Sequence, residues 1–250
     1  MTSNAAALIL LLCAGGGGVE TVDSILAKTW QSQGIEPAAV CSDEEFLRRV
    51  SLDIIGRIPT LDELNSFKGN SDRAAKIDEL LASGDFPRFW SEVWTATFNG
   101  YISLYGSDRE VLRLWLVDAF AKEMPYDRLV TRLITAKGSS AFDGPTNFLV
   151  RYPEEPAVKI SRLFLGVRLD CARCHDHPFD VWTQRDFYDL AAFFGKTRRV
   201  QTRFTNTVYT TEANQTTILW PPEGEGDASE RQPLAARCPF KLTSSSSAAP

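Results

Sequence analysis

Residues 156–194 read PAVKISRLFLGVRLDCARCHDHPFDVWTQRDFYDLAAFF, and this stretch decides the fold around the most reactive side chains of the chain. Apolar residues recur at helical spacing before Cys171 and again after Thr183. The spacing predicts one helix over 155–168, which ends at the cysteine pair, and a second helix that opens at Thr183. We therefore expect the two cysteines to lie on a short connection between two rigid helices.

The same helical pattern extends outward over residues 20–196. Four sites carry a hydroxyl residue with an acidic residue three positions later, the capping-box signature of a helix start. Further helices are predicted near 21–32, 72–83, 88–99 and 126–136, with Gly and Pro between them. The four predicted capping boxes are Ser42/Glu45, Thr60/Glu63, Ser107/Glu110 and Thr183/Asp186.

The pattern changes after Gly195. Val200, Thr202, Phe204 and Val208 alternate with polar residues, which predicts strands and a short β hairpin within 197–220. Residues 221–250 are rich in Pro, Gly, Glu and Ser and are predicted to be a disordered low-complexity tail. The fold class expected from these patterns is mainly α: one compact multi-helix domain over 20–196, a β hairpin and a tail.

The composition limits the classes of function. The chain has 250 residues, of which 44% are hydrophobic and 24% charged, so it can bury a core without disulfides or metals. Its formal net charge of −5 offers no basic excess, which argues against nucleic acid as a partner. The short cluster Lys196, Arg198, Arg199 and Arg203 is predicted to be a solvated face.

The N-terminal segment resembles the apolar core of an export signal. Residues 5–14 are small or apolar and are followed by four glycines, a length that suits a signal peptide and is too short to span a bilayer. Because Met1–Asn4 contains no Lys or Arg, a disordered start is the alternative for 1–19. The signal-like segment leads us to expect a periplasmic or secreted protein. No stretch after residue 20 is apolar enough for a membrane helix.

Cys171-Ala172-Arg173-Cys174-His175 has the C-x-x-C-H form of a c-type haem attachment site. Two thiols at this spacing can form thioethers with the two vinyl groups on one edge of a porphyrin. The adjoining His175 can then ligate the iron, since histidine is a common axial ligand. The motif predicts one covalent haem c at Cys171, Cys174 and His175.

Four aromatic residues after the motif have two possible roles, because they can wall a macrocycle or fill the core. The other side of the iron has no evident ligand. Met124, the only methionine besides Met1, is expected to have a surface or capping role. The four aromatic residues are Phe179, Trp182, Phe187 and Tyr188.

His177 opens a second interpretation. It is too close along the chain to His175 to reach the opposite face of the same ring. Cys171, Cys174, His175 and His177 are all zinc-type ligands, and Asp180 or Cys238 could replace one of them. A divalent-metal site, with Asp180 as the base of a hydrolytic reaction, is therefore an alternative, although structural zinc sites normally use two separated segments.

A third interpretation is a non-catalytic module with a Cys171–Cys174 disulfide, and Cys41 could also pair with Cys238. No βαβ pattern precedes Cys171, which argues against a thioredoxin-like redox pair. The acids near the motif leave two roles open as well: Asp176 or Asp180 can orient His175 through its second ring nitrogen, or can cap the following turn.

Several longer stretches resemble the second planctomycetal cytochrome-type domain, a domain of unknown function found in large exported bacterial proteins. The stretches are EFLRRVSLDIIGRIPT (45–60), MPYDRLV (124–130), FLGVRLDCARCHDHPFD (164–180) and QRDFY (184–188). The resemblance spans about residues 42–196, and its most specific part is C-A-x-C-H-D-H-x-F-D. It implies an extracytoplasmic, mainly helical domain with haem on Cys171, Cys174 and His175.

The leading expectation from the sequence is a haem-binding electron-transfer module rather than a catalyst. Its iron would alternate between Fe(II) and Fe(III), with a separate redox protein or domain as partner. Burial of the haem and hydrogen bonds to His175 would set the reduction potential.

Overall fold

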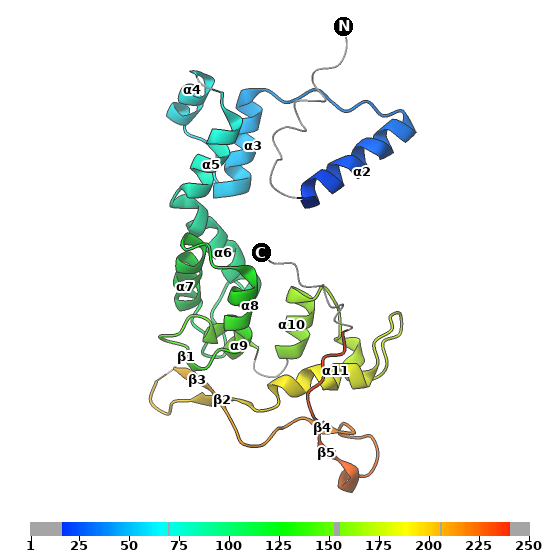
Figure 1. Cartoon of the computed structure of the whole chain (residues 1–250). Helices are drawn as coiled ribbons and strands as arrows, with labels where there is room; N and C mark the ends of the chain where they lie inside the picture. Colours follow the sequence, from blue (N-terminus) through cyan, green and yellow to red (C-terminus); the bar gives the residue numbers. More distant parts are fainter. Residues whose placement is uncertain (1–16, 70, 153–155, 206, 241–250) are drawn as a thin grey trace, which may run out of the picture. The chain divides into compact units, whose positions relative to one another are not determined.

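The structure is a computed structural model that describes residues 17–69, 71–152, 156–205 and 207–240 (Figure 1). It is mainly helical with small antiparallel sheets, as the sequence predicts. The chain divides into two compact units, Met1–Phe86 and Pro87–Pro250.

The first unit is formed by short amphipathic helices. Ser42 begins one of them by accepting a hydrogen bond from the Glu45 backbone N–H, and Gly56 ends it with a φ of 72°, a left-handed conformation that favours glycine. Leu47 and Ile55 are the apolar residues buried along this helix. The helices are α2 (Gly17–Gln33), α3 (Asp43–Ile55), α4 (Leu61–Gly69) and α5 (Arg73–Ala82).

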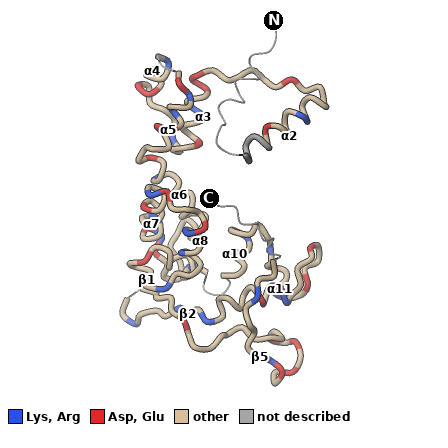
Figure 2. Tube along the Cα trace, viewed as in Figure 1, with Lys and Arg blue, Asp and Glu red and all other residues tan. Residues whose placement is uncertain are grey.

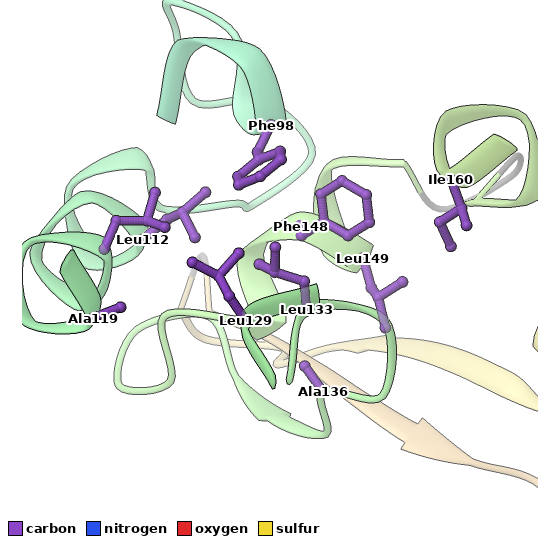
Figure 3. Close-up of a cluster of buried hydrophobic side chains, with 10 residues drawn as sticks. Phe98, Leu112, Ala119, Leu129, Leu133, Ala136, Phe148, Leu149 and Ile160 are labelled. Carbon is purple, nitrogen blue, oxygen red and sulfur yellow. The ribbon is translucent and has the colours of Figure 1, made fainter. Parts of the chain in front are cut away.

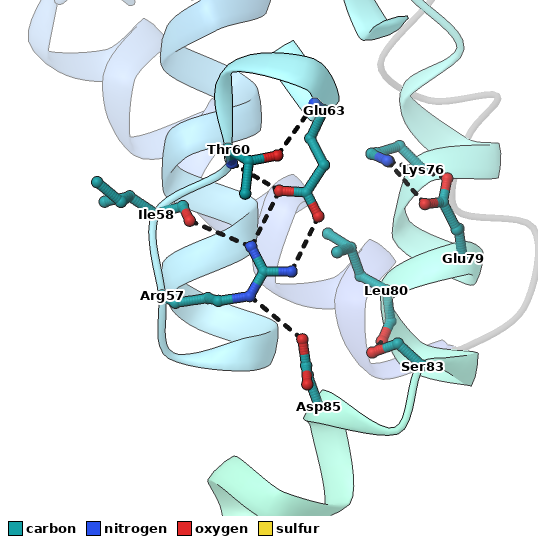
Figure 4. Close-up of polar contacts among 9 residues, drawn as sticks. All are labelled: Arg57, Ile58, Thr60, Glu63, Lys76, Glu79, Leu80, Ser83 and Asp85. Atoms are coloured by element: carbon teal, nitrogen blue, oxygen red, sulfur yellow. Dashed lines mark hydrogen bonds and ion pairs between the residues drawn. The ribbon is translucent and has the colours of Figure 1, made fainter.

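The start of α4 is held by a network around Arg57 (Figure 4). Thr60 and Glu63 form the predicted capping box, because the Thr60 N–H donates to Glu63 and the Glu63 N–H donates to the Thr60 hydroxyl. Arg57 donates two hydrogen bonds of 2.9 Å to the same carboxylate and a third of 3.2 Å to Asp85. These bonds lower the pKa of Glu63 to about 2 and raise the pKa of Arg57.

The second unit has a core between its first helices and the helix before the motif (Figure 3). Phe98 and Phe148 are fully buried with ring centroids 5.7 Å apart, and Phe164 lies 5.7 Å from both. Met124 packs against this cluster, so it lies deeper than the predicted surface position. The helices are α6 (Asp85–Asn99), α7 (Arg109–Ala121), α8 (Tyr126–Ile134), α9 (Thr146–Arg151), α10 (Pro156–Phe164) and α11 (Gln184–Ala191).

The start of α7 differs from the prediction. Asp108, not Ser107, caps the helix and accepts hydrogen bonds from Glu110 and Val111. The Ser107 hydroxyl is already engaged with Leu104 and with the buried Asn99 side chain, so it is not available as a cap. The carboxylate of Asp108, one residue later, is therefore the N-cap of α7.

The predicted hairpin is present as β2 (Thr197–Gln201) and β3 (Val208–Glu212), paired with Val200 opposite Tyr209. A third strand that the pattern missed, β1 (Gly138–Ser139), pairs with the other side of β3. Since β3 is central and β2 is an edge strand, Val208 is buried whereas Val200 is 51% exposed. Phe204 lies in the loop between the two strands and is 93% exposed.

Residues 221–240 differ from the predicted disordered tail. They follow β4 (Leu219–Trp220) and contain the 3₁₀ helix η3 (Ala228–Glu230) and β5 (Gln232–Pro233), which pairs with β4. Leu234 is buried, and the Phe240 ring lies 5.1 Å from that of Trp182. These contacts order a segment whose composition is typical of disorder; residues 241–250 lie outside the described part.

The expected export signal falls mainly outside the described residues, since only 17–19 of residues 1–19 are described, as the start of α2. No helix within the described ranges has the length and apolar character needed to cross a bilayer.

Acidic and basic residues occur together on both units (Figure 2). Within the predicted solvated cluster, Lys196, Arg199 and Arg203 are exposed, and Arg198 and Arg199 also donate to the backbone carbonyls of Gln215 and Tyr105.

Glu63→Gln is expected to weaken the pH dependence of folding. Because the folded-state pKa of Glu63, about 2, is below the ordinary value of 4.5, its stabilising effect is complete above pH 4.5 and is lost as the pH falls toward 2. The pair is partly exposed, so we expect about 1 kcal/mol at neutral pH. Urea unfolding of parent and variant at several acidic pH values measures this difference.

Gly144→Ala should destabilise the second unit by about 1–3 kcal/mol, the cost of forcing a methyl group into a packed site. An added Cβ would lie 2.2 Å from Trp115 Cβ and 3.0 Å from the Val111 carbonyl oxygen. Gly84→Ala is the matched control, because nothing lies within 4 Å of its added Cβ. Differential scanning calorimetry that finds equal melting temperatures for both variants would contradict this packing argument.

Candidate functional site

The C-x-x-C-H segment forms a single tight turn between α10 and α11. Residues Cys171–Arg173 are a 3₁₀ helix, η1, in which the Cys174 N–H donates to the Cys171 carbonyl at 3.3 Å. This i to i+3 bond closes the turn that separates the two cysteines. The two thiol-bearing residues therefore stand at the two ends of one turn.

The turn is anchored from inside by apolar residues. Leu169 and Ala172 are both 0% exposed and belong to a cluster with Val158 of α10 and Phe187 and Leu190 of α11. Because Ala172 is between the cysteines and points into this cluster, its neighbours are directed outward. Burial of one alanine thus determines which side of the turn carries the sulfur atoms.

Cys171, Cys174 and His175 are exposed, and both thiols are free. The structure thus contains no Cys171–Cys174 disulfide. Cys41 and Cys238 are free thiols as well, so the other suggested pairing is not formed either. Two unbonded sulfur atoms and an imidazole are presented to solvent within five consecutive residues.

The His175 ring is oriented by the backbone. Its Nδ1 atom lies 2.7 Å from the Asp176 carbonyl oxygen, an acceptor, so the contact assigns the proton to Nδ1. Nε2 then carries the lone pair that can ligate a metal. Metal-ligating histidines commonly have this arrangement, in which the second ring nitrogen donates to a carbonyl or carboxylate.

His177 has the opposite arrangement. The ring Nδ1 accepts a hydrogen bond from the Phe179 backbone N–H at 3.2 Å, and the backbone N–H of His177 donates to the Trp182 carbonyl at 2.8 Å. The neutral ring therefore carries its proton on Nε2, and the lone pair on Nδ1 is engaged by the backbone. The role that sequence alone could not assign to His177 is, in this structure, the bracing of the loop between the motif and α11.

The two acids of this loop also bind backbone. Asp176 Oδ1 accepts from the Gln184 N–H at 2.8 Å at the start of α11, and Asp180 Oδ1 accepts from Val181 at 2.8 Å. Capping of the following turn, one of the two predicted roles, is the one observed. The orientation of His175 comes from the carbonyl of Asp176 and not from its carboxylate.

The four aromatic residues near the motif have different environments. Phe187 is buried in the cluster under the turn, and Trp182 and Tyr188 are partly buried against it. Phe179 is 94% exposed, and Val181 beside it is 81% exposed. Of the four, only Phe179 is both exposed and near the thiols along the chain, so it is the one left available to cover an apolar group.

Tyr188 of α11 lies near the motif. Burial is the main cause that raises the pKa of its hydroxyl, and the charge of Arg173 opposes this shift. The phenol is therefore within electrostatic range of Arg173, which stands between the two cysteines.

A buried carboxylate anchors α11 and was missed by the sequence analysis. Asp189 is 1% exposed and accepts hydrogen bonds of 2.8 Å from Arg185 and from Arg237 of the C-terminal segment. The i, i+4 spacing of Arg185 and Asp189 was the only signal in the sequence. This double pairing fixes α11, and hence the support of the motif, to residues near the end of the described chain.

The alternative metal cluster is not assembled in the described ranges. No three His, Cys, Asp or Glu residues there converge closely enough to hold a metal ion, so Cys171, Cys174, His175, His177 and Asp180 do not form a common site. The same donors are compatible with a covalently attached haem, which needs two accessible thiols and one free imidazole nitrogen. Met124 packs in the other core cluster and not in the one under the motif.

Comparison with known proteins identifies one family. The sequence profile of PSCyt2, described as a protein of unknown function (DUF1549), matches residues 21–199. No curated protein and no solved structure matches the chain.

In the haem-free chain, the two histidines should show opposite neutral tautomers. We expect an Nδ1–H form for His175 and an Nε2–H form for His177, since one ring donates to a carbonyl and the other accepts from an amide. Long-range ¹H–¹⁵N correlation spectra above pH 8 measure this directly. Asp176→Ala should leave both tautomers unchanged but destabilise the second unit by about 1 kcal/mol through loss of the cap. Identical tautomers would contradict the assignment.

Proposed function

Because the chain belongs to the PSCyt2 family, a planctomycete cytochrome-type domain of unknown function, we propose that it is an exported c-type cytochrome module with one covalent haem and a role in single-electron transfer. The observation that carries the proposal is the orientation of the His175 ring. Its Nδ1 contacts the Asp176 carbonyl oxygen, which leaves Nε2 to bind iron. The proposed electron partner is another protein or domain outside the cytoplasm.

The two cysteines would hold the haem by thioether bonds. In each attachment a thiol S–H would add across a vinyl group, with a new C–S bond and the hydrogen on the other vinyl carbon, which needs no net oxidation. This reaction needs free, accessible thiols on one side of a turn. Cys171 and Cys174 meet that requirement because Ala172 occupies the buried side between them.

His175 would bind the iron, and bound haem would supply one-electron chemistry between Fe(II) and Fe(III). The protein's own contribution is orientation and electrostatics. The carbonyl of Asp176 increases the electron density of the imidazole, which favours the oxidised iron and lowers the reduction potential. The exposed Phe179 and Val181 provide apolar surface near the attachment residues.

Covalent haem tests the proposal directly. The chain, with an export signal, is expressed in a host that matures c-type cytochromes, and denaturing gels are stained for haem peroxidase activity. We expect about one haem per chain, retained on denaturation, as the C-x-x-C-H motif requires. Cys171→Ala/Cys174→Ala should abolish the stained band, and His175→Ala should abolish it or change the absorption spectrum of the reduced protein.

His177→Ala is the matched control, because the proposal assigns His177 to bracing the loop and not to binding the haem iron. It should keep covalent haem and the parent spectrum. Elemental analysis and thiol titration of the same samples separate the alternatives. A colourless chain with stoichiometric zinc would favour the divalent-metal site with Asp180 as base, and a chain with neither cofactor and no free thiols at Cys171 and Cys174 would favour the disulfide module. Either result would overturn the haem proposal.

A further inference from the structure

Five large apolar side chains project into solvent from three loops of the second unit. Each of them is more than half exposed. A single exposed apolar side chain is ordinary, but several that gather on one surface mark a contact with another molecule or with a membrane. The five residues, called here the apolar patch, are Tyr101, Ile102, Tyr105, Phe142 and Phe204.

The loops that carry the apolar patch meet around one hollow. The hollow is lined by Leu104 and Tyr105 from the loop between α6 and α7, by Ala141 after β1, and by Thr207 between β2 and β3. Every residue of the apolar patch is one of these lining residues or lies within three positions of one. Segments far apart in the sequence thus bring their apolar side chains to the same part of the surface.

A buried polar network fixes the three loops relative to one another. The fully buried Asn147 side chain accepts a hydrogen bond from the Asp108 backbone N–H at 2.6 Å and donates one to the Ser140 carbonyl at 2.9 Å. The Ser140 N–H donates to the Val208 carbonyl at 2.8 Å, and the Ser140 hydroxyl accepts from the Val208 N–H at 3.1 Å. A rearrangement that drew the apolar patch inward would break these buried hydrogen bonds, which is costly.

Tyr105 is held in an uncommon backbone conformation. Its φ is 55°, in the left-handed region that bulky residues rarely adopt and keep only where their surroundings enforce it. Its carbonyl accepts a hydrogen bond from Arg199 of β2, and the Arg151 guanidinium lies 5.7 Å from the centre of its ring. The surroundings therefore hold this ring at the surface.

Basic residues accompany the apolar patch. Between Asp189 and Glu212 the sequence has four basic residues and no acidic one, in a chain whose net charge is −5. Arg203 directly precedes Phe204, and both are exposed, as is Lys196 before β2.

The acids beside the apolar patch are less exposed than these cations. Asp108 and Asp143 are partly buried. Asp108 caps α7, and the Asp143 carboxylate accepts a hydrogen bond from the Thr146 hydroxyl at 2.8 Å. The charge presented to solvent around the apolar patch is therefore mainly positive.

We propose that the apolar patch docks the chain on the surface of an anionic lipid bilayer, with its aromatic side chains at the level of the headgroups and with Lys196 and Arg203 beside the lipid phosphates. Aromatic residues are enriched at membrane–water interfaces, and an anionic leaflet attracts basic residues. The contact is peripheral and does not require haem.

The shape of this surface favours a lipid over a peptide. A bound helix or extended peptide needs a continuous apolar groove or a free strand edge. The hollow between the three loops is lined mainly by polar residues, such as Ser103, Ser107 and Ser140, and offers no apolar groove. Side chains that project singly from separate loops can each enter a bilayer interface, which yields around them.

Sedimentation of the purified full chain with lipid vesicles tests the proposal. One vesicle preparation contains phosphatidylcholine alone, and the other contains equal parts of phosphatidylcholine and the anionic phosphatidylglycerol. We expect the parent to bind the anionic vesicles about tenfold or more tightly at low salt. High salt should reduce this difference, because it screens exposed charges.

Four variants separate the apolar and the electrostatic contributions. Phe142→Ser and Phe204→Ser should each weaken binding to anionic vesicles about tenfold, since each removes a ring that the interface would bury. Lys196→Gln and Arg203→Gln should each weaken it about fivefold and leave binding to neutral vesicles nearly unchanged. All four residues are exposed, so thermal melts should match the parent.

Tyr126→Ser and Arg128→Gln are the matched controls and should bind like the parent. Both residues are exposed on α8, near its start. The start of α8 follows the end of α7, a helix of 13 residues and therefore about 20 Å long, whose other end adjoins the loop of Tyr101 and Tyr105. Parent and variants share the apolar residues 5–14, so differences among them report on the apolar patch and not on that segment.

Equal binding of the parent to both vesicle types, no binding to either, or equal losses in the patch and control variants would overturn the proposal. Analytical ultracentrifugation tests a different occupant. A parent dimer that binds no vesicles and dissociates in Phe142→Ser and Phe204→Ser would assign the apolar patch to a second copy of the chain and would also overturn the proposal. Failure of the haem experiment would leave the vesicle result unaffected.

Discussion

The burial of Leu169 and Ala172 between α10 and α11 is the constraint on which the candidate site depends. A turn of C-x-x-C form can direct its sulfur atoms inward or outward, and the sequence pattern does not choose between them. Here Ala172 is buried in the apolar cluster, and Cys171 and Cys174 are exposed to solvent. A structural metal or disulfide would need the sulfurs to face one another or a third ligand, whereas attachment of a large flat group needs them exposed.

The cluster is held in place by charge as well as by apolar packing. Asp189 is almost completely buried, and leaving such a carboxylate without a partner would cost several kcal/mol. One of its two arginines, Arg185, lies on α11 itself and the other, Arg237, on the C-terminal segment, so removing that segment would leave the buried carboxylate with one of its two partners. The ordered residues up to Phe240 are therefore part of the support of the motif, although they lie far from it in sequence.

The segment Cys171–Asp180 contains two histidines and two acids with four different tasks. His175 is held through one ring nitrogen by a carbonyl, His177 accepts a backbone N–H, Asp176 caps α11 and Asp180 closes its own turn. Because each of these side chains makes a separate contact with the backbone, they do not converge on a common metal site, although all four are of types that bind metals. Backbone N–H groups in a short loop need acceptors, and nearby carboxylate and imidazole groups satisfy them.

Sequence alone determined the helical class, the hairpin, two complete capping boxes and the family, because all of these depend on local periodicity or on contiguous motifs. It also located the reactive residues Cys171, Cys174 and His175. It could not determine that Val200 faces solvent, that Asp108 replaces Ser107 as a cap, or that residues 221–240 are ordered. Each of these depends on which distant segment lies alongside: β1 against β3, Asn99 against Ser107, Arg237 against Asp189. Only tertiary structure decides such contacts, because they join residues whose spacing along the chain carries no periodic signal.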